Sequence, residues 1–234
     1  MQMKCVLKVG RPLYVPFNYN YQVQSAIYAK LRGINESDFW HDDGFGAGKI
    51  YKAFVFGKLS GTHHVVDKHL VFTDEIALEI RSPLFEFIDI LQRSFETAPQ
   101  IKLFDTVLSL SRASLTNRHI NASSALFASD SPVVVHETAD DGKTIYYSPD
   151  SEEFFKRLED NFYSKYKAVS GFPAEKIKIS PSGSYKKIVT SYKGVWINAY
   201  MGRFLVKGNE KALEFIYNTG LGEKNSQGFG MMRL

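Results

Sequence analysis

Apolar residues in the first half of the chain recur with the spacings of strands and helices. A helix predicted over residues 18–32 places Val23, Ile27 and Leu31 four positions apart on one face. A second helix is predicted to open at Ser82, with this serine as its cap and a proline at its first position. Four further segments have strand patterns: residues 2–9, 50–58, 65–72 and 100–110. The predicted order is therefore strand, helix, strand, strand, helix, strand.

The second half repeats this order. A helix is predicted to open at Ser148, with Phe155, Leu158 and Phe162 as its core stripe, and another helix covers residues 209–218. Strands are predicted over residues 125–136, 175–190 and 194–207 and in the last few residues of the chain. Strand, helix, two strands, helix and strand make up the ferredoxin-like unit.

The chain is therefore predicted to be an α+β protein of two tandem ferredoxin-like domains with a groove between their sheets. The domains are expected to cover residues 1–115 and 120–234. Their boundary is expected near residues 112–123, where serine, threonine and asparagine cluster.

A glycine-rich segment closes the chain. Its four glycines fall in eleven positions: Gly220, Gly222, Gly228 and Gly230. Backbone N–H groups of such a loop can hold a phosphate, and Lys224, Asn225 and Ser226 add a charge and polar donors. A bulky residue at Gly222 or Gly228 should obstruct either the turns of the loop or the approach of a phosphate, and the polar residues favour the phosphate. A glycine-rich hairpin without a ligand is the alternative.

Basic residues are unevenly distributed along a chain whose formal net charge is only +4. Residues 176–207 contain seven lysines and arginines, no acidic residue, and interleaved tyrosines and a tryptophan. This composition favours binding of a polyanion such as RNA over a merely solvated sheet face. The candidate RNA-binding side chains here are Lys186, Lys187, Lys193 and Arg203.

Composition excludes several other classes. With 44% hydrophobic and 23% charged residues the chain is ordinary globular material, and it has no run of about 18 apolar residues for a membrane span. No apolar leader follows the basic N-terminal residues, so a cytoplasmic location is expected. The single cysteine, Cys5, is expected to be a small core residue on a strand.

The terminal segment from Gly220 to Gly230 resembles the glycine-rich signature of the CRISPR repeat-processing endoribonucleases. These belong to the superfamily of repeat-associated RNA-binding proteins with ferredoxin-like domains. A second block, over residues 13–58, is similar to the same family and includes Val15-Pro16-Phe17-Asn18 before the first helix. The resemblance implies a prokaryotic enzyme that cleaves precursor CRISPR RNA within its repeats and leaves 5′-hydroxyl and 2′,3′-cyclic phosphate ends. It implies no cofactor.

Metal-free RNA cleavage needs a base near the 2′-hydroxyl, an acid near the 5′-oxygen and a cation at the phosphate. The positions that match the catalytic pattern of the family are Tyr28, His41 and Lys49, with Lys52 as a near rival. Taken singly, each has a plainer interpretation: an exposed loop histidine, a packed tyrosine and a solvated lysine. Their order and spacing together favour catalysis.

No metal site is predicted, because the spacing of His63, His64 and His69 does not match a zinc motif. An RNA-binding subunit of the same superfamily that does not cleave is the main alternative, and an unrelated metabolic enzyme would need a cofactor site. The expected partners are CRISPR repeat RNA and the CRISPR effector complex, with no membrane. A monomer and a homodimer both remain open.

Overall fold

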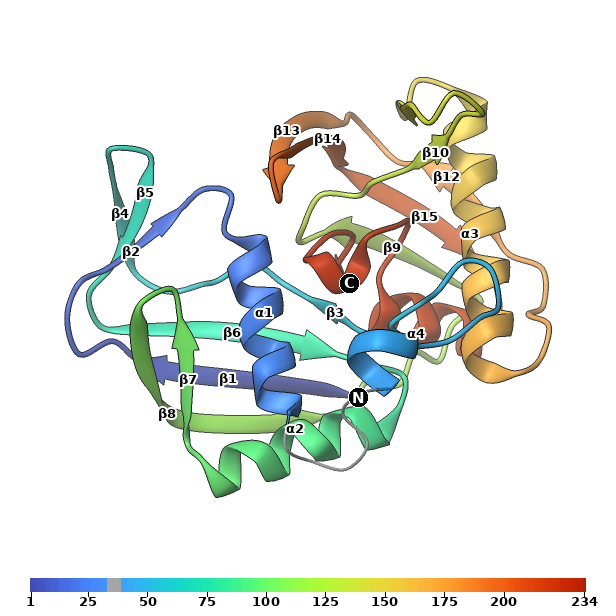
Figure 1. Cartoon of the computed structure of the whole chain (residues 1–234). Helices are drawn as coiled ribbons and strands as arrows, with labels where there is room; N and C mark the ends of the chain where they lie inside the picture. Colours follow the sequence, from blue (N-terminus) through green and yellow to red (C-terminus); the bar gives the residue numbers. More distant parts are fainter. Residues whose placement is uncertain (33–38) are drawn as a thin grey trace.

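The first half of the protein is built on a five-stranded antiparallel sheet (Figure 1). The structure is a computed structural model and describes residues 1–32 and 39–234, apart from the side chains at 41 and 42. Across the sheet the strand order is β3-β6-β1-β8-β7. These strands are β1 (Gln2–Lys8), β3 (Val55–Phe56), β6 (Glu75–Arg81), β7 (Gln100–Leu103) and β8 (Thr106–Thr116).

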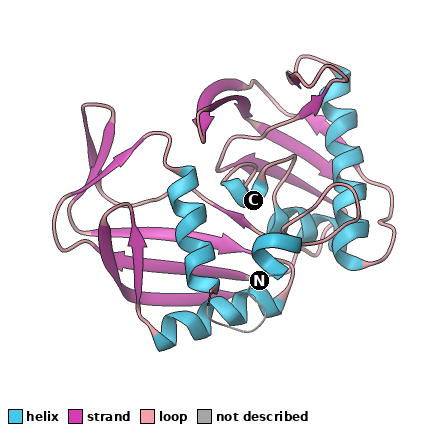
Figure 2. Ribbon diagram, viewed as in Figure 1, coloured by secondary structure: helices cyan, strands magenta, loops and turns pink. Residues whose placement is uncertain are grey.

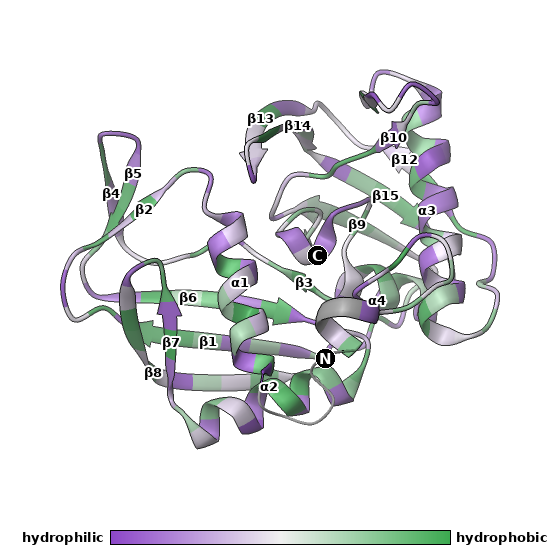
Figure 3. Ribbon diagram, in the orientation of Figure 1, coloured by the Kyte–Doolittle hydropathy of each residue, from purple (hydrophilic) through white to green (hydrophobic). Residues whose placement is uncertain are grey.

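Two helices, α1 (Asn20–Leu31) and α2 (Phe85–Thr97), share one apolar core with this sheet (Figure 2). Cys5, Ile27 and Phe87 have no exposed surface in this core, and green apolar residues run along β1, β6 and α2 in Figure 3. Cys5 is thus the core strand residue that the sequence predicts. Burial raises the pKa of its thiol to about 12.

The third strand of the first unit is not the predicted one. Residues 65–72 do form strand structure, but in a hairpin of β4 (His63–Val66) and β5 (His69–Phe72) that pairs with β2 (Leu13–Pro16). The third strand of the unit is β6, which alternates buried Ile76, Leu78 and Ile80 with more exposed residues and pairs with β1.

Other boundaries also differ from the prediction, and the segments expected as single strands over 100–110, 175–190 and 194–207 each form two strands. The strand expected over residues 50–58 is reduced to Val55–Phe56. The last strand of the unit, β8, begins after a turn that follows β7 and extends to Thr116, into the predicted linker, so residues 117–123 connect the two sheets. The helix expected at Ser82 begins at Phe85, because the buried Ser82 hydroxyl donates to the Ala53 carbonyl (2.8 Å) and accepts from the amide of Leu84 (3.1 Å).

The second half has a four-stranded sheet in the order β12-β15-β9-β16. Its strands are β9 (Ser124–Ser129), β12 (Lys178–Pro181), β15 (Arg203–Lys207) and β16 (Met232–Arg233). Helices α3 (Glu152–Ser170) and α4 (Glu210–Thr219) complete the unit. Their N-caps are Ser151, not Ser148, and Asn209, each accepting from a backbone amide of the first turn.

Each unit has the sheet order 2-3-1-4 when its four principal strands are numbered along the chain. The predicted α+β fold of two ferredoxin-like units is thereby confirmed. A hairpin of β13 (Lys186–Tyr192) and β14 (Val195–Met201) lies between β12 and β15, and a short hairpin of β10 (His136–Thr138) and β11 (Thr144–Tyr146) precedes α3. Among the described residues, no helix is long and apolar enough to cross a membrane.

Candidate functional site

The glycine-rich loop, residues 220–230, connects α4 to β16 and is folded back on itself. The Leu221 amide donates to the Gly230 carbonyl (2.8 Å), which closes the two ends of the loop. The Asn225 side-chain amide donates to the carbonyls of Leu221 (3.2 Å) and Phe229 (3.1 Å) across the loop. Because both contacts lie within the loop, Asn225 acts as an internal brace.

Lys165 of α3 holds the loop through three hydrogen bonds. Its Nζ donates to the carbonyl of Gly220 (2.8 Å), to that of Gly222 (3.4 Å) and to Oδ1 of Asn225 (2.7 Å). Burial, with a smaller contribution from the charge of Lys49, lowers the pKa of Lys165 to about 7, against an opposing effect of Glu223. In its protonated form, Lys165 donates all three of these hydrogen bonds and ties the first residues of the loop to Asn225.

The loop glycines are needed by the fold itself. All four are buried. A Cβ on Gly230, whose φ is +71°, would lie 2.0 Å from the Leu221 carbonyl oxygen. A Cβ on Gly228, whose φ is +84°, would lie 2.6 Å from the Phe56 ring and 2.8 Å from the Asn20 side chain. These positions explain the glycines by turns and close packing. An RNA-binding role of the four glycines and of Asn225 stays a prediction.

Two sets of polar contacts join the loop to the first half. The Asn20 amide on α1 donates to the Gln227 carbonyl (2.9 Å) and, less closely, to that of Gly228 (3.4 Å). Glu223, only 8% exposed, pairs with Lys49 and with the His136 ring. Burial raises the pKa of Glu223, but the hydrogen bonds and charges of His136 and Lys49 outweigh burial and bring this pKa to about 2. The charge of Lys49 is thus already matched by a carboxylate.

A cavity of about 770 Å³ lies where α1, the tip of the β13–β14 hairpin and the glycine-rich loop meet. Its lining includes Tyr28, Arg32, Lys52, Lys193, Ser226 and Gln227. The described lining residues include three cations and no carboxylate, a composition that suits a phosphodiester. Of the sequence-predicted residues, this cavity brings together Tyr28, Lys193 and Ser226.

Lys49 and Lys52, the rival lysines, both line a neighbouring cavity of about 210 Å³, where Lys49 is paired with Glu223. Only Lys52 also lines the cavity of Tyr28. The backbone of His41 belongs to the π-helical turn η1 (Phe39–Asp43), and its side chain lies outside the described part of the chain. The described residues contain no group of His, Cys, Asp and Glu placed to bind a metal ion.

A further cavity, of about 450 Å³, lies between the two halves on the other side of the contact between α1 and the loop. Lys186, Ile188 and Thr190 line it from one face of β13. Lys187 alternates to the opposite face, and Arg203 lies on β15 outside this lining. The predicted groove therefore has Lys186 on its wall and does not have Lys187 there.

The end of the β13–β14 hairpin is docked on α1 and on Asn18, two residues before the helix. Thr190 Oγ1 donates to Asn18 Oδ1 (2.7 Å), the Tyr192 hydroxyl donates to Gln24, and Lys193 Nζ lies 4.5 Å from the centre of the Tyr21 ring. Because Tyr192 and Lys193 also line the larger cavity, one strand, β13, passes both cavities.

Comparison with known proteins identifies the family. The family model described as CRISPR associated protein Cas6, C-terminal, matches residues 115–234, half of the chain. The chain belongs to the Cas6 family. The resemblance that the terminal loop predicts is thus confirmed.

Individual relatives and solved structures match along nearly the whole chain. CRISPR-associated endoribonuclease Cas6 1 of Methanocaldococcus jannaschii is 25% identical over 243 residues, which cover 99% of this chain and 92% of the relative. A solved structure described as the characterization of a Cas6-related gene from Pyrococcus furiosus superposes with a TM-score of 0.85 at 23% identity, covering 100% of this chain and 97% of its own. Another, described as a RAMP protein binding different RNA substrates, has a TM-score of 0.84 at 23% identity and covers 100% and 99%. The prediction of an endoribonuclease agrees with the name of the first relative, and the two structures bear out the fold.

Four residues that line the cavity of about 210 Å³ are absent from the predicted set: His136, Asn161, Lys165 and Glu223. Asn161 and Lys165 extend the core stripe of α3 beyond Leu158, and a lysine on a core stripe is a signal that was available. The Asn161 side-chain amide is buried, and neither its nitrogen nor its oxygen has a hydrogen-bond partner in the structure. The partners of Glu223 lie 87 and 174 positions away in the sequence, so no local pattern indicates them.

Proposed function

We propose that this chain cleaves precursor CRISPR RNA within its repeats by general acid–base chemistry without a metal, leaving 5′-hydroxyl and 2′,3′-cyclic phosphate ends. Membership of the Cas6 family and the name of its Methanocaldococcus jannaschii relative support the reaction. The observation that carries the proposal is the cationic cavity that Tyr28 and Lys52 share with Ser226 of the glycine-rich loop.

In the proposed reaction the ribose 2′-oxygen loses its proton to a base and attacks the adjacent phosphorus. The bond from phosphorus to the 5′-oxygen then breaks, and an acid protonates the leaving oxygen. His41 is assigned to proton transfer because its unperturbed pKa lies near neutrality. Tyr28 orients or donates to the reacting phosphate.

The cation that stabilises the charged phosphorane is assigned to Lys52, in place of Lys49. Lys52 lines the cavity of Tyr28, and Lys49 does not. A cation stabilises the phosphorane only where it can reach the reacting phosphate. Lys49 is assigned to holding the loop before β3 against the glycine-rich loop.

The substrate is proposed to enter along β13. A single RNA strand would pass Lys186 and Thr190 in the cavity between the halves and reach Lys193 at the cationic cavity. Lysines along one track provide the sequence-independent part of RNA binding, which weakens as salt concentration rises.

The experiment is a single-turnover cleavage assay of labelled repeat RNA in EDTA, with Lys52→Ala and Lys49→Ala as a matched pair. We expect the wild-type protein to cleave without metal. Lys52→Ala should reduce the rate by roughly 10²-fold, the scale of losing one transition-state contact, and Lys49→Ala by much less. The upstream fragment should resist 3′-end labelling until its cyclic phosphate is removed. If the Lys49 variant were the slower one, the assignment of the two lysines would be reversed.

A repeat-RNA-binding subunit that does not cleave is the second candidate. The solved structure described as a RAMP protein binding different RNA substrates has the same fold, so the fold alone does not separate binding from cleavage. Intact repeat RNA after long incubation, together with tight binding in the same buffer, would select this second function.

A further inference from the structure

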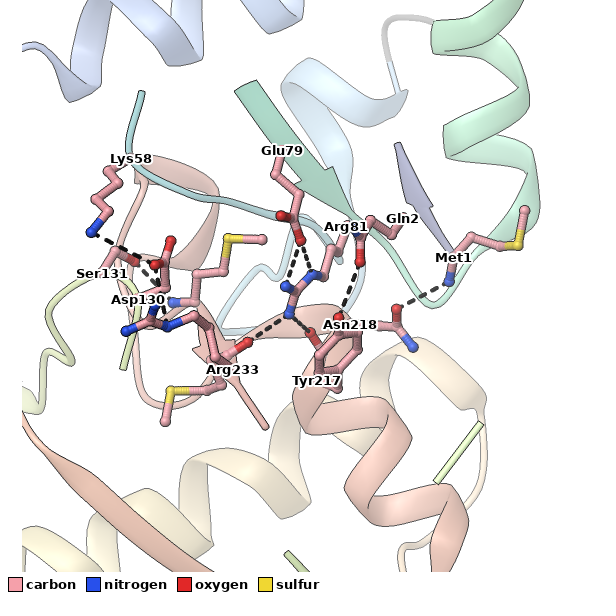
Figure 4. Close-up of polar contacts among 12 residues, drawn as sticks. Met1, Gln2, Lys58, Glu79, Arg81, Asp130, Ser131, Tyr217, Asn218 and Arg233 are labelled. Carbon is pink, nitrogen blue, oxygen red and sulfur yellow. Dashed lines mark hydrogen bonds and ion pairs between the residues drawn. The ribbon is translucent and has the colours of Figure 1, made fainter. Parts of the chain in front are cut away.

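Arg81 is a buried cation at the contact between the two halves. It ends β6, is 4% exposed, and its Nε donates to the carboxylate of Glu79 (2.6 Å) (Figure 4). One of its terminal nitrogens donates to the carbonyls of Met232 (2.6 Å) and Tyr217 (3.2 Å) in the second half. Its guanidinium carbon also lies 3.7 Å from the centre of the Tyr217 ring.

The two carbonyls stand on either side of the glycine-rich loop. Tyr217 lies in the last turn of α4, just before Gly220, and Met232 begins β16, just after Gly230. The Tyr217 carbonyl is among the last four of its helix, which have no partner within the helix, and β16 is an edge strand. A single nitrogen of Arg81 therefore ties together the two ends of the loop.

Arg81 is also close to the candidate catalytic segment. It pairs in register with Val55 of β3, three positions after Lys52. The next residue of β3, Phe56, is the one that packs against Gly228. The strand that follows Lys52 and the loop that carries Ser226 are thus both anchored at Arg81, and these two residues line one cavity.

Other contacts at this interface do not join the two ends of the glycine-rich loop. Gln2 accepts from the Tyr217 hydroxyl (3.0 Å), and the Met1 amine donates to Asn218 Oδ1 (3.0 Å). Asp130 lies 3.5 Å from Arg233 and 3.9 Å from Lys58 in partly exposed ion pairs. None of these contacts involves both ends of the loop. Arg233, 59% exposed, is therefore a matched control for Arg81.

We propose that Arg81 is a positioning residue for RNA cleavage: it fixes both ends of the glycine-rich loop against the half that carries Tyr28 and Lys52. This inference rests on the proposed cleavage at that cavity. The guanidinium fork suits the role because it can bond the Glu79 carboxylate and two carbonyls at once, which a lysine ammonium cannot do with the same fixed geometry. The loop then has its position before RNA binds.

The test compares Arg81→Met, Arg81→Lys and Arg233→Met with the wild-type protein, at a temperature where circular dichroism shows each of them folded. Three quantities are measured: the single-turnover cleavage rate at saturating protein, the Kd for a repeat RNA with a 2′-deoxy substitution at the cleavage site, and amide hydrogen exchange over residues 220–230. The exchange measurement needs no cleavage. It therefore separates failure of this inference from failure of the proposed function.

For Arg81→Met we expect a rate loss of roughly tenfold to a hundredfold, the scale of misplacing a catalytic contact by about 1 Å. Loop amides should exchange faster, the Kd should change little, and Arg81→Lys should be intermediate. Arg233→Met should match the wild type in the rate and in loop exchange. Unchanged rate and exchange in a folded Arg81→Met protein would overturn the inference, as would equal effects of the two arginine variants. If Arg81→Met does not fold, Glu79→Gln, which loosens Arg81 without removing it, should give the same pattern at smaller size, and wild-type behaviour of that variant would overturn the inference.

Discussion

The two halves of the molecule carry a hairpin at the same place in the same topology, but the two hairpins differ in their contacts and in their charge. Each is inserted between the second and third principal strands of its unit, β4–β5 in the first half and β13–β14 in the second. The β4–β5 hairpin lies beside β2 and extends away from the groove (Figure 1). All four residues of β4 are exposed. The β13–β14 hairpin is docked on α1.

The two hairpins also differ in the charge of their residues. The insertion at residues 57–74 has two lysines and two aspartates, whereas residues 182–202 have three lysines and no acidic residue. The shared topology thus decides where a hairpin can be inserted, and the side chains decide what it does. Under the proposed function, the first half would supply proton transfer and the second half would hold RNA.

The sharpest test of this division is His41→Ala. Removing one acid–base residue should slow cleavage by roughly 10²–10⁴-fold, because proton transfer to the leaving oxygen loses its donor. The Kd for uncleavable repeat RNA should stay near the wild-type value. Single-turnover rates and a binding titration check both parts, and a large loss of affinity would mean that the first half also holds the RNA.

Gly228→Val tests the contact of the glycine-rich loop with Phe56 and Asn20 of the first half. Because a Cβ there meets Phe56 and Asn20 at a positive φ, we expect the free energy of unfolding to fall by about 2–4 kcal/mol. This reverses the preference from sequence alone for lost RNA binding with intact stability. Urea unfolding measures the change, with Gly10→Val as the control because a Cβ at Gly10 meets nothing within 4 Å. Unaltered stability with lost RNA binding would restore the earlier preference.

Lys186→Ala and Lys187→Ala sharpen the comparison within one hairpin. Lys186 lines the cavity between the halves and Lys187 is on the other face of β13. Loss of one phosphate contact should reduce the slope of log affinity against log salt by about one unit for Lys186→Ala only. Titrations at several salt concentrations measure both slopes, and equal effects would place RNA on both faces of the hairpin.

The smallest effect is expected in the β4–β5 hairpin. His64→Ala combined with Lys68→Ala should leave RNA affinity within about twofold of wild type, since no phosphate contact is assigned there. The same titration provides the measurement. A marked loss of affinity would show that the two hairpins hold RNA from both sides of the groove.

The order of strands and helices in each ferredoxin-like unit is predictable from the sequence, whereas the number of strands and their pairing partners are not. Periodicity predicts one strand over 65–72, where the structure has a turn at residues 67–68 between β4 and β5. The pairing of β5 with β2 depends on contacts that a single sequence does not contain. The site follows the same rule. Tyr28 is predicted from its match to the family pattern, whereas the pairing of Lys49 with Glu223 spans 174 positions and has no local signal in the sequence. Likewise, the loop was identified from its glycines, and its supports, Lys165 and Arg81, come from elements far from it.

The burial of Cys5 has a practical consequence for detecting RNA at the β13–β14 hairpin. Its thiol is the only one in the chain, has no exposed surface and has a pKa raised to about 12, so thiol-directed dyes should leave it unmodified in the folded protein. A cysteine introduced at Lys187, off the groove wall, would then be the single reactive position. A fluorophore there would report, in real time and without removing any native thiol, when the hairpin meets RNA.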